Sequence, residues 1–447
     1  MPATSTDPQA QAVPSPGAAP RPPQALEGVT VLDLSHALAG PIASTYLADF
    51  GATVLKVEPP GAGDIARGWG PPFHGDDAAY FVSLNRNKRS VELDLKHPEG
   101  RELFLRLAEQ ADVVLENFRV GTVDRLGIGP AAVAARNPRA IYCSISGFGQ
   151  DGPYRDRAAM DLIVQAESGM MSLTGEPGRT PVRAGVSIAD LQAGMHALVA
   201  VLMALHVRHR TGRGQFIDVS MLEGQLALLD HAIGIYLADG QLFGRMGTAY
   251  RTIVPYQTFR TRSEDLALAV GSDSLWRAFC QLLGLTALTD DPRFATNAAR
   301  TRNREVLVPI LQEVFLTRTY AEWEALLVPA GVPVGAINAL DRVVKHPQVV
   351  ARGLLRETHH PAAASAPVIA PFFRMSETPG GGRAPAPLLG EHTDATLRDL
   401  LGLSPEEIGR LRAAGALGAA SRRRAPPPSA PPKPPPSPKS HPPEEVP

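Results

Sequence analysis

The chain of 447 residues has few cysteines and no long apolar run, and its charges nearly cancel. Its two cysteines, Cys143 and Cys280, are far apart and lack the spacing of metal ligands, which excludes a disulfide framework and favours a reducing, cytoplasmic compartment. Lysine plus arginine (44) balances aspartate plus glutamate (45), so no charge excess attracts nucleic acid. No apolar run reaches the roughly 20 residues that span a bilayer, and we expect no membrane partner.

Both ends of the chain lack the apolar residues of a folded core. Residues 1–25 are rich in alanine, proline, serine and glutamine, without the apolar centre of a secretory signal or the repeated arginines of a transit peptide. Residues 419–447 are rich in proline, which favours an extended, polyproline-like chain. We interpret both segments as disordered tails around a folded chain from 26 to 418.

Between the tails, short apolar runs typical of buried strands alternate with helical stretches. The runs cover residues 29–34, 52–57, 91–95, 113–116, 141–145 and 215–221. This alternation predicts an α/β fold with a doubly wound, mainly parallel, Rossmann-like sheet in a large domain over 26–240. The composition changes near Gly240, which predicts a smaller α+β domain over 241–345 and a return to the large domain over 346–418.

The first predicted strand is followed by Ala39-Gly40-Pro41 and not by the G-x-G-x-x-G fingerprint of dinucleotide sites. This counts against a NAD-dependent oxidoreductase, which the opening strand-helix-strand unit would otherwise suit. The loops at 35–40, 117–121 and 146–149 all follow strands. We therefore expect them to converge on one crevice at the carboxyl edge of the sheet.

Two kinds of loop feature suit the binding of anions. Gly147, Gly149 and Gly185 are candidates to offer backbone N–H groups to an oxyanion, and simple turn glycines are an equal alternative. The segment Asn85-Arg-Asn-Lys-Arg-Ser90 combines basic and amide side chains, as phosphate sites do. A solvated basic turn explains this segment equally well.

The longest apolar helical pattern begins directly after Asp190 and ends at Thr211-Gly-Arg-Gly214, where glycine suits a helix C-terminus. Residues 197–205 are apolar throughout, which predicts a helix buried on all sides. Asp190 then lies at the N-terminus of a core helix, where exposed backbone N–H groups favour negative charge. The local pattern favours an ordinary N-cap aspartate, and the alternative, a carboxylate nucleophile, depends on the rest of the chain.

Several short motifs follow one another along the chain. They are Leu26-Glu-Gly28, Val31-Leu-Asp-Leu34, Leu38-Ala-Gly-Pro41, Gly51-Ala52, Lys56-Val-Glu58, Asn85-Arg-Asn-Lys-Arg-Ser90, Glu116-Asn-Phe118, Gly147-Phe-Gly149, Thr211-Gly-Arg-Gly-Gln215 and Pro387-Leu-Leu-Gly-Glu-His-Thr393. Each is weak alone. In this order and at these separations, over about residues 26–417, the chain resembles the class III CoA-transferases, the CaiB/BaiF family.

This resemblance implies that Asp190 is the catalytic nucleophile, and that two ring-like subunits thread through each other as an intertwined homodimer. It also implies coenzyme A contacts at the positions that match those of the formyl-CoA:oxalate transferases in the family. These positions are His36, Leu38, Ala39, Pro59, Leu93, Asp94, Leu95, Lys96, Asn117, Phe118, Arg119, Arg125, Ala158 and Met221. Three of them depart from that group, since Leu38 replaces a glutamine, Pro59 an arginine and Ala158 a lysine.

The family also contains α-methylacyl-CoA racemases, whose histidine base would fall at Met160. Methionine cannot accept a proton, so two-base racemisation lacks one base and a transferase is favoured. The alternatives are a racemase-type isomerase, a NAD-dependent oxidoreductase and a CoA-binding scaffold without catalysis.

Further motifs resemble those members that transfer CoA from succinyl-CoA to glutarate, namely Trp69-Gly-Pro-Pro-Phe73, Ile141-Tyr-Cys-Ser144, Arg245-Met-Gly-Thr248 and Ile253-Val-Pro-Tyr-Gln257. They imply a dicarboxylic acid as acceptor. Arg67, Arg86 and Arg245 are candidates to bind its distal carboxylate, and Arg86 is preferred because it lies in the basic segment. The implied reaction carries CoA as a thioester on Asp190, with no metal and no cofactor beyond coenzyme A itself as substrate.

Overall fold

The computed structural model describes residues 23–242, 244–360, 363–381 and 384–419. Of the two predicted tails, all but residues 23–25 and 419 lie outside this part of the chain.

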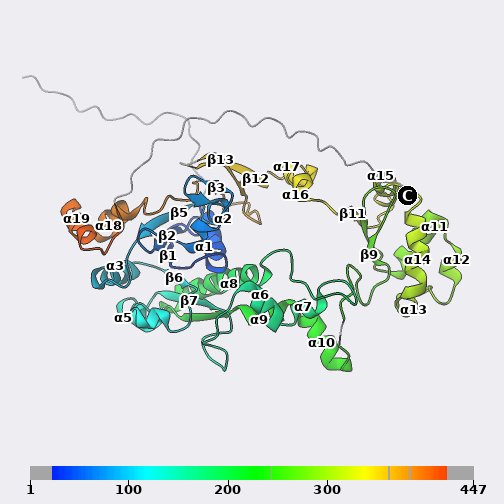
Figure 1. The fold of residues 1–447 in the computed structure, drawn as a ribbon, viewed down its shortest axis with the longest axis horizontal. Coiled ribbons are helices and arrows are strands. Elements are labelled where there is room, and N and C mark those ends of the chain that lie inside the picture. The colour runs from blue at the N-terminus through cyan, green and yellow to red at the C-terminus, as the bar shows by residue number, and fades with distance from the viewer. Residues whose placement is uncertain (1–22, 243, 361–362, 382–383, 420–447) are drawn as a thin grey trace, which may run out of the picture.

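An all-parallel, six-stranded sheet forms the core of the larger unit, on the left in Figure 1. Its strands are β1 (Thr30–Asp33), β2 (Thr53–Glu58), β5 (Lys88–Glu92), β6 (Val113–Glu116), β7 (Ile141–Ser146) and β8 (Phe216–Ser220). In space they follow the order β5-β2-β1-β6-β7-β8. This is the strand order of a Rossmann-like, doubly wound sheet, so the predicted α/β fold class is confirmed.

The two faces of this sheet bury separate cores, because successive residues of a strand point to opposite sides. In β1, Val31 belongs to the core under α1 (Ala39–Asp49) and α8 (Ile188–Thr211). The next residue, Leu32, belongs to the core under α3 (Pro98–Ala108) and α18 (Thr393–Leu401). Strands buried on both faces read as continuous apolar runs, which explains why the sequence pattern located them.

Helix α8 crosses α1 at a close approach, since a Cβ on Gly194 would lie 2.5 Å from the carbonyl oxygen of Ala39. The helix ends at Gly212, whose φ of 72° makes the left-handed C-cap that glycine favours. Among the described helices, α8 is the one long and apolar enough to cross a bilayer, but it packs against α1 and the sheet as a core helix does.

The prediction that α8 is buried on all sides is wrong for the single chain. One row of its apolar side chains is exposed, namely Val199, Leu202, Met203 and Val207. A run of apolar residues shows that a helix avoids water, but it does not show whether the same chain covers every face.

A second unit has its own antiparallel sheet, with β9 (Tyr256–Phe259), β10 (Leu266–Ala269) and β11 (Val334–Ala336) in the order β11-β10-β9. Its helices are α11 (Asp273–Leu283), α12 (Ala287–Asp290), α13 (Asn297–Arg302), α14 (Arg304–Phe315) and α15 (Tyr320–Leu327). They enclose a separate hydrophobic core around Trp276, Phe315 and Trp323. The limits of this unit at 241 and 345 stay a prediction.

Two connections join these units, so the ribbon follows a ring-shaped path (Figure 1). One runs through α10 (Asp230–Asp239) into β9. The other leaves β11 through α16 (Leu340–Val343), α17 (Pro347–Ala351) and the hairpin of β12 (Leu355–His360) and β13 (Ala363–Ile369). The chain then returns to the main sheet, where the Glu92 N–H donates to Thr393 Oγ1 at 3.0 Å.

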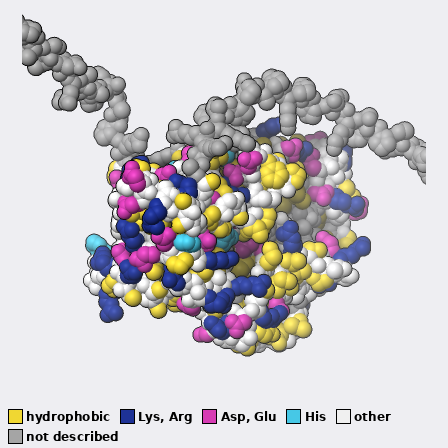
Figure 2. All heavy atoms as spheres, turned by 60° about the vertical axis from the view of Figure 1, so that its left-hand side comes forward, with side chains coloured by type: hydrophobic (Ala, Val, Ile, Leu, Met, Phe, Trp, Pro, Cys, Tyr) yellow, Lys and Arg dark blue, Asp and Glu magenta, His cyan; other side chains and the backbone are white. Residues whose placement is uncertain are grey.

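The remaining elements are short. They are η1 (Ile65–Gly68), β3 (Phe73–His74), β4 (Asp77–Ala78), α2 (Ala79–Leu84), α4 (Thr122–Arg125), α5 (Pro130–Arg136), α6 (Asp161–Glu167), α7 (Met170–Leu173), α9 (Met221–Leu228) and α19 (Pro405–Ala413). On the face shown in Figure 2, basic, acidic and hydrophobic side chains are interspersed, in keeping with a net charge near zero.

Candidate active site

The strand order of the main sheet reverses between β1 and β6, and the loops after these strands are joined by two reciprocal hydrogen bonds. The His36 N–H donates to Asn117 Oδ1 (2.8 Å), and Asn117 Nδ2 donates to the His36 carbonyl (2.9 Å). The His36 ring meets Phe118 edge-on at 5.2 Å, and burial together with Lys56 lowers the pKa of His36. Doubly wound sheets bind their ligands at such a reversal, beyond the carboxyl ends of the strands.

A cavity of about 490 Å³ opens at this edge of the sheet, a volume typical of small-molecule sites. Loops after β1, β6 and β7, the start of α6, the loop before α8, and α2 contribute to its wall. The lining residues include Ala37, Ala39, Trp69, Tyr80, Asn117, Phe118, Arg119, Ser146, Gly147, Arg155, Arg157, Met160, Asp161, Arg183, Ser187, Asp190 and Met221.

Asp190 is the third residue of α8, and it lines the cavity. Ser187 occupies the N-cap position, so the interpretation of Asp190 as an ordinary N-cap residue is wrong. Burial, and after it the negative charge of Asp161, raises the pKa of Asp190 to about 7. We expected the helix N-terminus to favour the ionised form, and removal from water beside a second carboxylate opposes that effect.

The start of α8 is capped from another helix. The Ser187 side chain makes no capping hydrogen bond. Instead, the Ala189 N–H donates to Asp161 Oδ1 at 2.9 Å, although Asp161 precedes Ala189 by 28 positions. Nothing in the local pattern around Asp190 pointed to this partner.

A buried carboxyl group supports the cavity wall behind Asn117 and Phe118. Glu116, at the end of β6, accepts the Phe118 N–H (2.7 Å) and the Ser144 hydroxyl. Burial raises the pKa of Glu116 to about 7. These bonds fix the turn that carries Asn117, Phe118 and Arg119 into the cavity.

Four arginines line the cavity, and the sequence predicted only Arg119 among them. Arg157 pairs with Glu167 at 2.9 Å. Arg155 donates to the Gln150 carbonyl at 2.9 Å. Arg183 donates to the adjacent Ala184 carbonyl at 2.9 Å and forms no ion pair with any residue that the structure describes. The three missed arginines lie in irregular loops, where no periodicity marks a side chain that faces a cavity.

Five of the fourteen predicted coenzyme A contact residues line the cavity, together with one candidate oxyanion glycine. Those that line the cavity with Asp190 are Ala39, Asn117, Phe118, Arg119, Gly147 and Met221. His36 and Leu38 adjoin lining residues, and Ala158 does likewise. The others lie outside the lining. Pro59 follows β2, the residues Leu93, Asp94, Leu95 and Lys96 follow β5, and Arg125 is the last residue of α4.

The three candidate oxyanion glycines have different surroundings. Gly147 lines the cavity, and a Cβ there would lie 2.0 Å from the Cβ of Ala159, so this close approach requires glycine. The Gly149 N–H already donates to Ser146 Oγ at 2.9 Å. Gly185 belongs to the loop before α8 but does not line the cavity. Gly147 is therefore the one candidate of the three that the geometry keeps.

The basic segment 85–90 is neither a phosphate site nor a solvated turn. Arg86 is buried in a bidentate pair with Asp49, with Nε–Oδ1 at 2.9 Å and Nη2–Oδ2 at 2.5 Å. Lys88 lies in β5 and pairs with buried Asp33 at 3.1 Å. The structure therefore gives no support to Arg86 as the residue that binds a substrate carboxylate, because its guanidinium is paired with Asp49 and does not line the cavity.

The other two arginines proposed for that role are also engaged elsewhere. Arg67 is buried in ion pairs with Glu58 (2.7 Å) and Asp77 (2.8 Å). Arg245 donates to the Arg179 carbonyl at 2.6 Å. Neither lines the cavity that contains Asp190.

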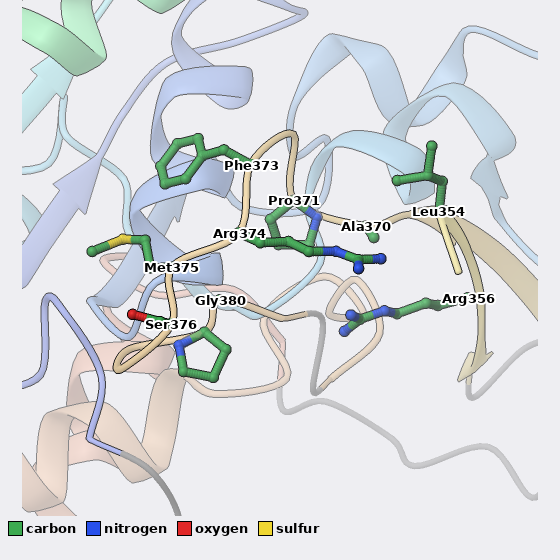
Figure 3. Close-up of a pocket in the computed structure, with 10 residues that line it drawn as sticks. Leu354, Arg356, Ala370, Pro371, Phe373, Arg374, Met375, Ser376 and Gly380 are labelled. Carbon is green, nitrogen blue, oxygen red and sulfur yellow. The ribbon is translucent and has the colours of Figure 1, made fainter. Parts of the chain in front are cut away.

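A second cavity of about 480 Å³ lies beside β12 and β13 (Figure 3). It is lined by Leu354, Arg356, Ala370, Pro371, Phe373, Arg374, Met375, Ser376, Pro379 and Gly380. These residues include two arginines but no carboxylate. Among the described residues, no group of three or more His, Cys, Asp or Glu side chains is arranged to hold a metal ion.

Comparisons with known proteins show the family to which the chain belongs. A family model described as CoA-transferase family III matches residues 26–393. The chain is 40% identical to the succinyl-CoA:glutarate CoA-transferase of Homo sapiens, over 88% of this chain and 90% of that protein. It is 41% identical to the succinate–glutarate CoA-transferase of Agrobacterium fabrum, over 84% of this chain and 95% of that protein. A crystal structure of a CaiB/BaiF family protein from Brucella suis superposes with a TM-score of 0.76 at 40% identity, covering 84% of this chain and 99% of that one.

Proposed function

This chain belongs to CoA-transferase family III, and we propose that it moves CoA from succinyl-CoA to a dicarboxylic acid such as glutarate through a thioester on Asp190. The observation that carries the proposal is the placement of Asp190 in the cavity at the strand reversal of the sheet. The relatives whose names specify succinyl-CoA and glutarate support the choice of substrates.

The proposed reaction consists of paired acyl transfers. The Asp190 carboxylate attacks the thioester carbonyl of the donor, which gives a mixed anhydride and CoA thiolate. The thiolate then attacks the Asp190 acyl carbon, releases the donor acid and leaves CoA on Asp190 as a thioester. The acceptor carboxylate attacks this thioester, and the same two steps in reverse yield the new acyl-CoA and free Asp190.

The surroundings of Asp190 suit this chemistry. A carboxylate that is poorly solvated is more reactive toward a carbonyl once it is ionised, and burial raises the pKa of Asp190 to about 7. The negative charge that develops on the attacked carbonyl faces a cavity lined by Arg119, Arg155, Arg157 and Arg183. Gly147 allows the two segments of the cavity wall to pack closely, because a Cβ there would lie 2.0 Å from the Cβ of Ala159.

We assign the distal carboxylate of the acceptor to Arg183. This arginine shares the cavity with Asp190 and forms no ion pair with any described residue, so its guanidinium is available for a charge-assisted bond. Arg119 belongs to the segment that the family resemblance gives to CoA. Arg157 is already neutralised by Glu167.

We propose further that two chains form the intertwined homodimer of the family. The ring-shaped path of the ribbon suits threading by a second chain (Figure 1). A second chain would bury the exposed apolar row on α8, and it would also bury the exposed side chains of Leu162, Ile163 and Val186 near the site. Size-exclusion chromatography with light scattering is expected to give twice the mass of the chain.

Incubation with succinyl-CoA and a panel of mono- and dicarboxylic acids tests the activity. We expect transfer to glutarate and other dicarboxylates, and mass spectrometry of a quenched reaction should find CoA on the peptide that carries Asp190. Asp190→Ala should abolish both signals. A thioester on another residue, or transfer that survives in Asp190→Ala, would contradict the mechanism.

A racemase-type reaction is not favoured at this site. Met160 lines the cavity at the position where a histidine base would be needed, and a thioether cannot move a proton at neutral pH. Retention of the α-proton of an acyl-CoA in deuterated water distinguishes the two reactions.

A further inference from the structure

Two buried side chains of α6 hold the loop that leads into α8. Asp161 Oδ1 accepts the Ala189 N–H (2.9 Å), and Asp161 Oδ2 accepts from Gln165 Nε2 (2.7 Å). Gln165 Oε1 in turn accepts the Ala184 N–H at 2.9 Å. Asp161 is 8% exposed and Gln165 is 0% exposed. Both ends of the segment from Ala184 to Ala189 are therefore tied to α6.

The donor and acceptor of each bond in this series of hydrogen bonds are determined by the backbone N–H groups at its two ends, Ala184 and Ala189. Backbone N–H groups can only donate, so Gln165 must turn its oxygen toward Ala184 and its NH₂ group toward Asp161. Asp161 then has to accept twice, from Gln165 and from Ala189. A carboxylate can do this, whereas an amide at position 161 would meet the Gln165 NH₂ with a donor of its own.

We propose that Asp161 and Gln165 are positioning residues, which hold the first turn of α8 so that the Asp190 carboxylate points into the cavity. The inference rests on the proposed function of Asp190 as the nucleophile. Asp190 directly follows Ala189, whose N–H is held by Asp161. A displacement of a reacting group by about 1 Å can reduce a rate roughly 100-fold, so the anchor of this turn matters to the chemistry.

Asp161 also acts on Asp190 through its charge. After burial, the Asp161 carboxylate is the group that raises the pKa of Asp190. The other charged or titratable side chains that face the same cavity are Tyr80 from α2, Arg119 from the loop after β6, Arg155 and Arg157 from the loop after β7, and Arg183 from the loop before α8.

Three variants test the hydrogen-bond chain. D161N puts two donors face to face, and Q165E puts two carboxylates face to face, so each is expected to lower kcat about 10- to 100-fold with little change in the KM for succinyl-CoA. The double variant D161N/Q165E restores every bond, because the new amide donates to the new carboxylate, which still accepts the Ala184 N–H. Its kcat is expected to recover at least tenfold over the weaker single variant.

Two further measurements separate positioning from general stability. In D161N the acid limb of kcat/KM is expected to move to lower pH, since a negative charge beside Asp190 is lost, and a loss of stability alone would leave the limb in place. Amide hydrogen exchange of the peptide covering 184–190 should speed up in both single variants and slow again in the double variant. Asp230→Asn, at the exposed start of α10, serves as the matched control and should change neither.

The outcomes are distinguishable. Folded single variants with wild-type kcat, or a double variant no better than the single variants, would overturn the positioning role. If the wild-type chain transfers no CoA to any acid, the proposed function fails, and hydrogen exchange alone then decides whether the two residues hold the loop.

Discussion

The Lys88 ammonium lies 3.1 Å from the Asp33 carboxylate in the central sheet, and both side chains are buried. The two residues belong to β5 and β1, which are separated in the sheet by β2. The Asp33 carboxylate also accepts from the Ser35 and Ser44 hydroxyls. Ser35 begins the loop that contributes Ala37 and Ala39 to the cavity wall, so Asp33 links the core of the sheet to the site.

Removal of one partner leaves the other charge buried without compensation, which costs about 3–5 kcal/mol in comparable pairs. We expect Lys88→Met to lower the free energy of unfolding by about 3 kcal/mol, measured by urea titration. Arg136→Met, which breaks exposed pairs with Glu102 and Glu109, is the control and should lower the free energy of unfolding far less. Equal effects of the two substitutions would contradict the importance of the buried pair.

The pH dependence of transfer should follow Asp190. Its pKa is raised to about 7, first by burial and then by Asp161, so the nucleophile is protonated and inactive at lower pH. We expect kcat/KM to rise about tenfold per pH unit below pH 7 and to level off above it. A profile that stays flat down to pH 5 would show that the substrate-free pKa does not limit the reaction.

The same carboxyl group should make the protein less stable at high pH. Because the folded-state pKa of about 7 exceeds the ordinary value of 3.8, the folded chain binds more protons than the unfolded chain between these values. Stability contributed by Asp190 is therefore present at low pH and is lost as the pH rises toward 7. We expect Asp190→Asn to be more stable than wild type by on the order of 1–3 kcal/mol at pH 8, and to show little difference at pH 3. Thermal unfolding of both proteins at pH 8 and pH 3 measures this difference in stability. A larger stabilisation by Asp190→Asn at pH 3 than at pH 8 would contradict the raised pKa of Asp190.

Arg183 should determine the preference for dicarboxylates. Loss of a charge-assisted bond of about 1.5–3 kcal/mol corresponds to a rise in KM of about 10- to 100-fold for glutarate in Arg183→Met. The KM for a monocarboxylate of similar length should stay within about twofold, since that acid has no group for Arg183 to bind. Arg277→Met, at an exposed position of α11 in the second unit, is the matched control. A parallel rise of KM for both acids would assign Arg183 to the CoA portion instead.

Gly147→Ala should distort the cavity wall. The new Cβ would lie 2.0 Å from the Ala159 Cβ, so the wall must shift, and we expect kcat to fall at least tenfold. Gly234→Ala, in α10, adds a methyl group where no atom lies within 4 Å and should leave kcat unchanged. Steady-state kinetics of the two variants with succinyl-CoA compares them directly, and full activity of Gly147→Ala would show that the wall adapts.

Local pattern was sufficient for the strands of the main sheet and for the helix α8, which contains Asp190. Val31 and Leu32 are apolar because the two faces of β1 bury different cores, and this produces a continuous run that is visible without coordinates. Gly212 ends α8 because its positive φ suits glycine, and the sequence shows that glycine directly. Asp190 was singled out as the candidate nucleophile because the motifs of the chain resemble a known family over most of its length.

Partners distant in the sequence were decided only by the tertiary structure. Arg86 looked like a ligand-binding residue until Asp49, 37 positions away, proved to be its buried partner. Asp161 caps α8 from another helix, and the exposed row on α8 appears only when the neighbours of each face are known. Periodicity reports which residues avoid water, because burial repeats with the geometry of a helix or strand. It carries no information about which charge meets which, since that depends on how distant segments pack together.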